Sequence, residues 1–503
     1  MKKIISFVSA IAAVSAFLNF SSFAADDISS VPAVYEEAVI GNEASQRITG
    51  DVNGDNEVLI SDLAVMQKWL YFGKGDLSLS EGDLNDDGVI DIFDMTRLRK
   101  ILLETDSDIK LPDSLSVYNI CQNITTDESE EPALSEEFIN GQMDFAVDIF
   151  KNATAPIGNS LVSPYSLMQA LAMTTNGTDS ETREEMEEAL GGMKIDELNK
   201  YLSAFNKNIT KGYKPVVSNV NSIWAVRDKS RMAPRKTFLN NAKKYYDADF
   251  YLAQFNEDTA KEMNKYVEDK TDGLIKDLVD KIDPNETIYL INTVTFNADW
   301  KNNYFGDHKP NATFINVYGE EQPCTLMLGI EKYIGDENTD GFIKEYANNS
   351  FAFAALLPQE GTDIKEYIDS LTGEKLRSLL TQESTENASC ALMKFGFRYK
   401  NDLKDELRAM GMNRAFDGDS ADFSRLSSAP SPTYLNDVSH STYINVNEKG
   451  TYAAAATAVR GLDGGGILSR LVILDRPFVY CIFDTNTGIP LFIGTIMDMD
   501  GTE

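Results

Sequence analysis

Two acidic segments of twelve residues have side chains spaced as calcium ligands. The segment DVNGDNEVLISD at 51–62 recurs as DLNDDGVIDIFD at 83–94, an offset of 32 residues. Calcium takes about six to eight oxygen ligands, and such a loop supplies them from its first, third, fifth and twelfth side chains and its seventh carbonyl. The ligands would be Asp51, Asn53, Asp55, Asp62 and the Glu57 carbonyl, then Asp83, Asn85, Asp87, Asp91, Asp94 and the Val89 carbonyl. The sequence therefore predicts two bound calcium ions.

The two loops are not equivalent. Leu59 cannot ligate through its side chain, whereas Asp91 at the matching place of the second loop can. Asn56 stands where the sharp turn usually needs glycine, and asparagine accepts left-handed backbone angles better than most residues. We expect the first loop to bind calcium more weakly.

Each loop runs into an apolar helical pattern that would hold it in place. Loops of this kind, with Asp at the twelfth position and one following helix each, resemble the dockerin module, which attaches proteins to cohesin domains of scaffoldins. The resemblance implies a small all-α module with a cohesin partner. The side chains that would face the cohesin are Ile60, Ser61, Ile92 and Phe93.

A second segment, residues 444–478, combines conflicting local preferences. Alanines 453–456 favour helix, Thr451, Thr457 and Val459 favour strand, and glycines 464–466 favour neither. Conflict of this kind is typical of a segment that changes conformation. Small side chains alternate along it and no proline occurs before Pro477, as insertion into the middle of a sheet would require.

This segment resembles the hinge of inhibitory serpins, and the likeness extends from about residue 134 to residue 500. Further matching blocks are NSLVSPYSLMQALAM (159–173), YLINTVTFNADW (289–300), MGMNRAFDGDSADFS (410–424), VSHSTYINVNEKGT (438–451) and RPFVYCIFDTNTGIPLFIG (476–494). The resemblance implies an α+β serpin fold with three β-sheets, about nine helices and an exposed reactive loop. A protease would cut the loop, which then inserts into the sheet and traps the protease.

Site residues follow from the same resemblance. The hinge comprises Glu448, Gly450, Thr451, Ala453, Ala454, Ala455, Ala456 and Thr457. Buried polar groups where the central sheet parts, expected to be joined by hydrogen bonds, are Asn159, Ser163, Ser166, Asn292 and His440. Trp300, Lys394 and Glu448 match the top of the opening, where a Lys–Glu pair would hold the base of the loop.

The bond that the protease cuts can be counted from either end of the loop. Seventeen residues from Glu448, counting it as one, places the cut between Gly464 and Gly465. Counting back from Pro477 places it near Gly466 and Ile467. Glycine or aliphatic residues there suit subtilisin-like or elastase-like serine proteases, and papain-like cysteine proteases are further candidates.

Composition excludes several other functions. An excess of 79 acidic over 46 basic residues, net charge −33, disfavours nucleic acid and anionic membranes as partners. With only His308 and His440, and no HExxH, GxSxG or phosphate-loop pattern, the chain lacks the parts of most hydrolases, and we assign no catalytic residue. Two alternatives stay open: a non-inhibitory serpin acting as a binding or carrier protein, and a glycoside-active enzyme with paired carboxylates.

The chain divides into a signal peptide (1–24), a flexible lead (25–47), the dockerin-like module (48–104), a linker (105–133) and the serpin-like domain (134–503). Lys2 and Lys3 before the apolar run 4–20 favour export, and no later stretch is long and apolar enough to span a membrane. We expect a secreted protein, attached to an extracellular cellulosome-type scaffold, with a monomeric inhibitor domain. The four cysteines form no close-spaced pattern, which favours separate buried thiols.

Overall fold

The computed structural model describes residues 52, 60–72, 82–85, 88–105, 117–122, 124–126, 131–211, 216–304, 308–436, 438–451, 470–500 and 502. The chain divides into two compact units, Met1–Leu102 and Leu103–Glu503. Within the described ranges, none of the helices combines the length and apolarity that crossing a membrane requires.

The described part of the first unit contains two long helices, each beginning near the end of a predicted calcium loop. They are α2 (Ile60–Phe72) and α4 (Ile92–Thr105). Met66 of α2 and Leu98 of α4 are fully buried and share a small core with Val52, Leu84 and Ile90. Each predicted helical pattern therefore forms a helix that packs its apolar side inward.

The described residues of the larger unit form nine α-helices and one short 3₁₀ helix. They are α5 (Glu136–Ala153), α6 (Pro164–Thr175), α7 (Ser180–Ala189), α8 (Ile195–Ile209), α9 (Lys236–Tyr246), α10 (Glu257–Lys270), α11 (Ile364–Ser370), α12 (Gly373–Leu380), α13 (Lys404–Ala409) and η1 (Arg414–Phe416). Their starts have ordinary physical causes. Ser135 caps α5 by accepting a hydrogen bond from the Phe138 amide, and Pro164 occupies the first turn of α6, where no amide donor is needed.

The strands within the described residues form three sheets. The strands are β1 (Val117–Asn119), β2 (Ser160–Val162), β3 (Val217–Val226), β4 (Asp249–Ala253), β5 (Ile288–Phe296), β6 (Ala298–Asp299), β7 (His308–Ile315), β8 (Glu321–Gly335), β9 (Thr339–Glu345), β10 (Phe351–Pro358), β11 (Asn387–Met393), β12 (Phe395–Asp402), β13 (Ser439–Val446), β14 (Gly450–Thr451), β15 (Arg470–Ile473), β16 (Phe478–Asp484) and β17 (Pro490–Ile496). Their orders are β1-β4-β3-β5, then β15-β11-β8-β9-β10-β16-β17-β2 with β7 beside β8, and β12-β13-β14-β6. The predicted α+β class with three sheets is confirmed.

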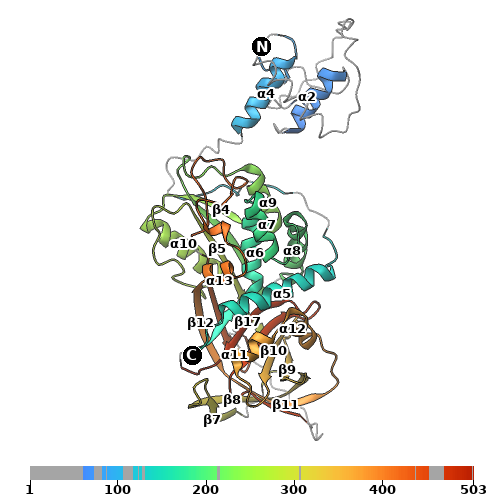
Figure 1. Ribbon diagram of the computed structural model, residues 1–503, viewed down its shortest axis with the longest axis vertical. Helices are drawn as coiled ribbons and strands as arrows, with labels where there is room; N and C mark the ends of the chain where they lie inside the picture. Colours follow the sequence, from blue (N-terminus) through green and yellow to red (C-terminus); the bar gives the residue numbers. More distant parts are fainter. Residues whose placement is uncertain are drawn as a thin grey trace. The chain divides into compact units, whose positions relative to one another are not determined.

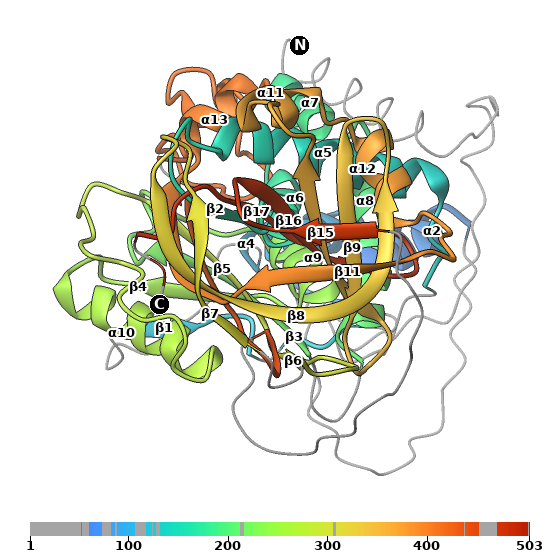
Figure 2. The same ribbon diagram turned by 90° about the horizontal axis from the view of Figure 1, so that it is seen from below.

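Helix α6 links the sheets. All of its residues are buried, and it packs against both β5 and β17, with α7, α8 and α9 gathered beside it (Figure 1). Figure 2 shows β15, β11 and β8 crossing the opposite end of this unit as neighbours. The four cysteines are separate and buried, as predicted.

The predicted linker at 105–133 requires a correction. Val117–Asn119 forms β1, which pairs antiparallel with β4, and Cys121 directly after it is fully buried. A strand of three residues is too short to show a period-two pattern, and this one forms because the edge of β4 offers hydrogen bonds. Residues 117–121 therefore belong to the fold of the larger unit.

Candidate functional site

The site lies between β5 and β13, two neighbouring strands that belong to different sheets. Strand β5 pairs with β3, and β13 pairs with β12. Among the described residues β5 and β13 do not pair with each other, although they lie side by side. At one end of the gap sits β14, where Thr451 pairs with Val446 of β13 and with Ala298 of β6. Because β14 runs antiparallel to both neighbours, a continuation of this strand would run along the gap.

Gly450 makes the close approach of β14 to β6 sterically feasible. A Cβ atom at this position would lie 2.1 Å from the Ala298 carbonyl oxygen and 2.8 Å from the Asp299 Cα. Both contacts are with backbone, which cannot move aside as a flexible side chain can. Only glycine therefore fits here, and the hinge glycine predicted from the sequence has a specific structural cause.

Thr451 is seated in the core at the entrance of the gap. Its side chain is 2% exposed, and its hydroxyl hydrogen-bonds the Tyr346 hydroxyl at 2.5 Å. Tyr346 in turn stacks on Trp300, with ring centres 4.4 Å apart. The first inward residue of the hinge is thus already packed as a strand residue.

The turn that precedes β14 is held by the segment 300–304. The backbone amide of Trp300 donates to the Lys449 carbonyl at 2.7 Å, and its indole Nε1 donates to the Asn447 carbonyl at 2.8 Å. The amide of Tyr304 donates to the Glu448 carbonyl at 3.1 Å. Lys394 forms an ion pair with the Glu448 carboxylate, and both side chains are about one-third exposed. The structure therefore brings the three residues expected at the top of the opening into contact with one turn.

Part of the expected polar network is present beneath the gap. His440 Nε2 accepts a hydrogen bond from the Ser163 amide at 3.0 Å. The Ser163 hydroxyl donates to the Leu491 carbonyl at 2.7 Å and accepts from the Ser166 amide at 3.3 Å. These bonds connect β13 to the start of α6 and to β17.

Asn159 and Asn292 lie elsewhere, which differs from the single joined network expected from the sequence. The Asn159 amide group bonds backbone at Met497 and Asp498, at the end of β17. Asn292 on β5 donates to Asn219 and Asn221 of the neighbouring β3, and its side-chain oxygen Oδ1 is buried with no hydrogen-bond partner among the described residues. The network is divided because Asn292 and His440 lie on strands that do not pair.

Burial sets the protonation of His440. The side chain is 3% exposed, and desolvation lowers its pKa to about 4. The ring is therefore neutral near pH 7. Because Nε2 accepts a hydrogen bond, the proton resides on Nδ1.

Several contributing residues were missed from the sequence. Tyr346 seats Thr451, and Thr442 joins β13 to β2 through a hydrogen bond from its hydroxyl to the Leu161 carbonyl at 2.8 Å. The buried pair Lys344–Glu331 lies under the segment 300–304. No local pattern distinguishes these residues from ordinary strand residues, since each contact joins positions far apart in the chain.

The recognition part of the loop falls outside the described residues. This concerns the rest of the predicted hinge, Ala453, Ala454, Ala455, Ala456 and Thr457, and the cut-site candidates Gly464, Gly465, Gly466 and Ile467. The described chain resumes at Arg470, where β15 pairs parallel with β11.

The described parts of the two acidic loops share one equivalent hydrogen bond. The Asp62 carboxylate accepts from the Val52 amide at 2.9 Å, and the Asp94 carboxylate accepts from the Leu84 amide at 2.8 Å, with both side chains fully buried. Gly88, at the sixth place of the second loop, has a φ of +88°, the left-handed turn that a calcium loop needs there.

A complete metal-ligand set cannot be assembled from the described residues. Within them, no group of three or more His, Cys, Asp or Glu side chains is placed to hold a metal ion. Asp51, Asn53, Asp55, Glu57 and Asp87 fall outside the described residues. Among the expected cohesin-facing residues, Ile92 is 47% exposed and Phe93 is 69% exposed. Ile60 and Ser61 are the first two residues of α2.

Comparisons with known proteins agree on one family. The family model described as Serpin (serine protease inhibitor) matches residues 140–499. An uncharacterized serpin-like protein of Thermococcus kodakarensis is 29% identical over 72% of this chain and 85% of its own length. A leukocyte elastase inhibitor of Xenopus laevis is 29% identical over 70% of this chain and 96% of its own length.

Solved structures of tengpin, a thermophilic serpin, resemble this chain. In its native state tengpin is 38% identical with a TM-score of 0.72, covering 76% of this chain and 100% of that one. In its latent state it is 37% identical with a TM-score of 0.66, covering 74% of this chain and 100% of that one.

Proposed function

Because the chain belongs to the serpin family of serine protease inhibitors, we propose that it is a secreted suicide-substrate inhibitor, attached to an extracellular scaffold of the cellulosome type. Its targets are serine proteases, with papain-like cysteine proteases as a second class. The protease cuts at or near Gly464 to Ile467, and the hinge then enters the gap between β5 and β13. Strain in the uncut fold, released by new strand pairing, drives the capture. Its role is to protect neighbouring scaffold proteins from proteolysis.

The observation that carries this proposal is the two-residue strand β14, which stands at one end of the stretch where, among the described residues, β5 and β13 do not pair. Thr451 stands opposite Ala298 on one side and Val446 on the other. Continuing this register places residues 453–461 opposite Phe296 to Ile288 of β5. The inward positions would be Ala453, Ala455, Thr457, Val459 and Gly461, all small or β-branched, on the face where Thr451 is buried.

The same register gives the polar residues of the gap a use. Thr457 would arrive between Asn292 of β5 and His440 of β13. The side-chain oxygen Oδ1 of Asn292 is buried without a hydrogen-bond partner among the described residues, and such an atom lowers the stability of the uncut state. The Thr457 hydroxyl is a donor of suitable size, so its arrival favours the inserted state. A cut after Gly464 would leave enough chain beyond Thr451 to run the whole length of β5.

The test is incubation with a panel of serine and papain-like proteases, followed by denaturing electrophoresis and sequencing of the released C-terminal fragment. Ala455→Glu places a charge on the inward face and should turn the inhibitor into a substrate. Ala456→Glu places the same charge on the outward face and should leave trapping intact. A stable complex formed by Ala455→Glu at wild-type yield would contradict insertion.

For scaffold attachment we propose that the first unit is a dockerin-like module holding two calcium ions. Asp62 and Asp94 place buried carboxyl groups, the oxygen ligands that calcium prefers, at the end of each loop, and Gly88 has the required turn geometry. Asp94 and the other acidic residues of the loops would hold calcium, which orders the loops on binding. Exposed Ile92 and Phe93 supply an apolar surface for a cohesin.

This second part is tested with the full chain and a recombinant cohesin. Binding should require calcium and disappear in excess chelator. Phe93→Asp should abolish cohesin binding while calcium uptake measured by titration calorimetry stays at two ions. Binding of equal strength without calcium would exclude a dockerin-type attachment and leave the inhibitory proposal untouched.

A further inference from the structure

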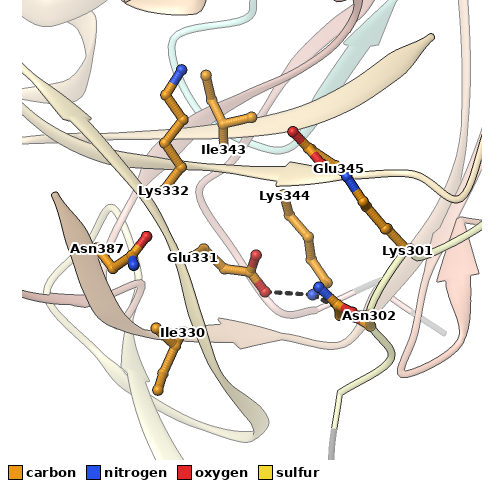
Figure 3. A pocket seen from close by; sticks show the side chains of 9 residues that line it. All are labelled: Lys301, Asn302, Ile330, Glu331, Lys332, Ile343, Lys344, Glu345 and Asn387. Carbon is orange, nitrogen blue, oxygen red and sulfur yellow. Dashed lines mark hydrogen bonds and ion pairs between the residues drawn. The ribbon is translucent and has the colours of Figure 1, made fainter. Parts of the chain in front are cut away.

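A buried ion pair lies beneath the segment that holds the hinge turn. Glu331 of β8 and Lys344 of β9 line a cavity of about 220 Å³ and form this ion pair. Figure 3 shows their two side chains pointing toward each other. Their side chains are 12% and 2% exposed. A second pair at the same cavity, Lys301 with Glu345, is about half exposed. The cavity therefore offers one buried and one solvated ion pair for comparison.

The Lys344 ammonium contacts the segment 300–304 at three points. It donates a hydrogen bond to the Asn302 carbonyl at 2.9 Å. It also lies 4.1 Å from the ring centre of Tyr304 and 5.4 Å from that of Trp300. Attraction between a cation and an aromatic face is stronger when water is excluded, as it is here. One buried cation thus fixes the backbone and both aromatic rings of this segment.

Stability alone does not explain a buried pair of this kind. Removing two charges from water costs about as much as their attraction returns, and an apolar pair of similar size is often equally stable. The pair instead fixes a position. Glu331 holds the Lys344 ammonium in place, and the ammonium in turn holds the Asn302 carbonyl. The same segment 300–304 holds the hinge turn 447–449, to which Trp300 and Tyr304 donate.

We propose that Lys344, held by Glu331, is a positioning residue for hinge insertion. It keeps 300–304 in the arrangement that folds the turn 447–449 back and directs Thr451 into the gap. The inference rests on the proposed inhibitory function, in which insertion competes with release of the cut inhibitor. Loosening the support slows insertion, so more inhibitor is cut without trapping the protease.

The experiment compares Lys344→Met with Lys301→Met, using a protease that the wild-type chain traps. Losing a hydrogen bond from a charged donor is expected to slow insertion about tenfold. The stoichiometry of inhibition is one plus the ratio of release to insertion, so its excess above one should rise by the same factor. Lys301→Met should match wild type, because its ion pair is exposed. Lys344→Arg keeps the positive charge, so its stoichiometry of inhibition should lie close to that of wild type.

A double variant separates positioning from stability. Glu331→Leu with Lys344→Met removes both charges together and should melt near the wild-type temperature, yet keep the raised stoichiometry. If the double variant inhibits like wild type, or if Lys301→Met is impaired as strongly as Lys344→Met, the positioning role is wrong. If the wild-type chain itself traps no protease, the inhibitory proposal fails first, which is a distinguishable result.

Discussion

His440 makes the folded state sensitive to acid. Its pKa is lowered to about 4 by burial, against 6.5 for an exposed histidine. A group whose folded pKa is lowered leaves stability intact above its unfolded pKa and removes it as the pH falls. The folded state should therefore lose up to about 3 kcal/mol between pH 6.5 and pH 4 from this side chain.

Urea unfolding at a series of pH values measures this loss. His440→Gln keeps an acceptor for the Ser163 amide but does not titrate, so its stability should fall less over the same interval. Parallel curves for the two proteins would show that His440 is not responsible.

Gly450→Ala should displace β14 from its pairing with β6. The added methyl group would lie 2.1 Å from the Ala298 carbonyl oxygen, so β14 must separate from β6. We expect the loss of Thr451 packing to cost about 2 kcal/mol and to raise the fraction of inhibitor cut as substrate. Lys449→Ala, at the adjacent exposed position, is the matched control and should behave like wild type in both assays.

At the residue scale, the sequence predicts a hinge beginning at Glu448 but not the contacts that hold its first residues. Gly450, Thr451 and Lys394 lie in recognisable segments, so their positions could be predicted. Tyr346 could not, because its hydrogen bond to Thr451 joins residues 105 positions apart. The unpartnered side-chain oxygen of Asn292 could not be predicted either, since only the strand pairing shows which face it occupies and which residues stand opposite.

At the element scale, long elements carry a strong local pattern in the sequence and short ones do not. The segments 136–150, 287–296 and 351–357 form α5, β5 and β10 because their apolar residues repeat with a helical or strand-like pattern. β1 and β14 have two or three residues each and exist only because a neighbouring strand offers its edge. Local sequence carries no comparable signal for them.

The strand β1 should stabilise the larger unit measurably. Besides pairing with β4, this segment donates from the Ile120 amide to the Phe250 carbonyl at 2.8 Å and buries Cys121 completely. Deleting residues 1–126 should lower the free energy of unfolding by about 2 kcal/mol. Deleting residues 1–105 leaves the strand in place and should leave the stability of the larger unit unchanged. Equal losses from the two deletions, measured by urea unfolding, would mean that β1 contributes nothing.

At the scale of the whole molecule, the two units have separate hydrophobic cores. The small core around Met66 and Leu98 has no member in common with the large core that contains Thr451's neighbours Val446 and Ala298. Units with separate cores can unfold independently. The proposed capture of a protease and the proposed attachment to a scaffold should then respond to different solution conditions.

Calcium removal tests this independence. An ion that binds only the folded first unit stabilises it by RT ln(1 + [Ca²⁺]/Kd), about 4 kcal/mol at a thousandfold excess over Kd. Calorimetry with calcium should show a transition for the first unit that shifts down or vanishes in excess chelator. The transition of the larger unit, and the stoichiometry of inhibition, should stay the same. A change in that stoichiometry on chelation would mean that calcium acts on the inhibitory unit itself. Asp94→Ala, which removes one proposed ligand of the second loop, would then have to reproduce the change in the presence of calcium.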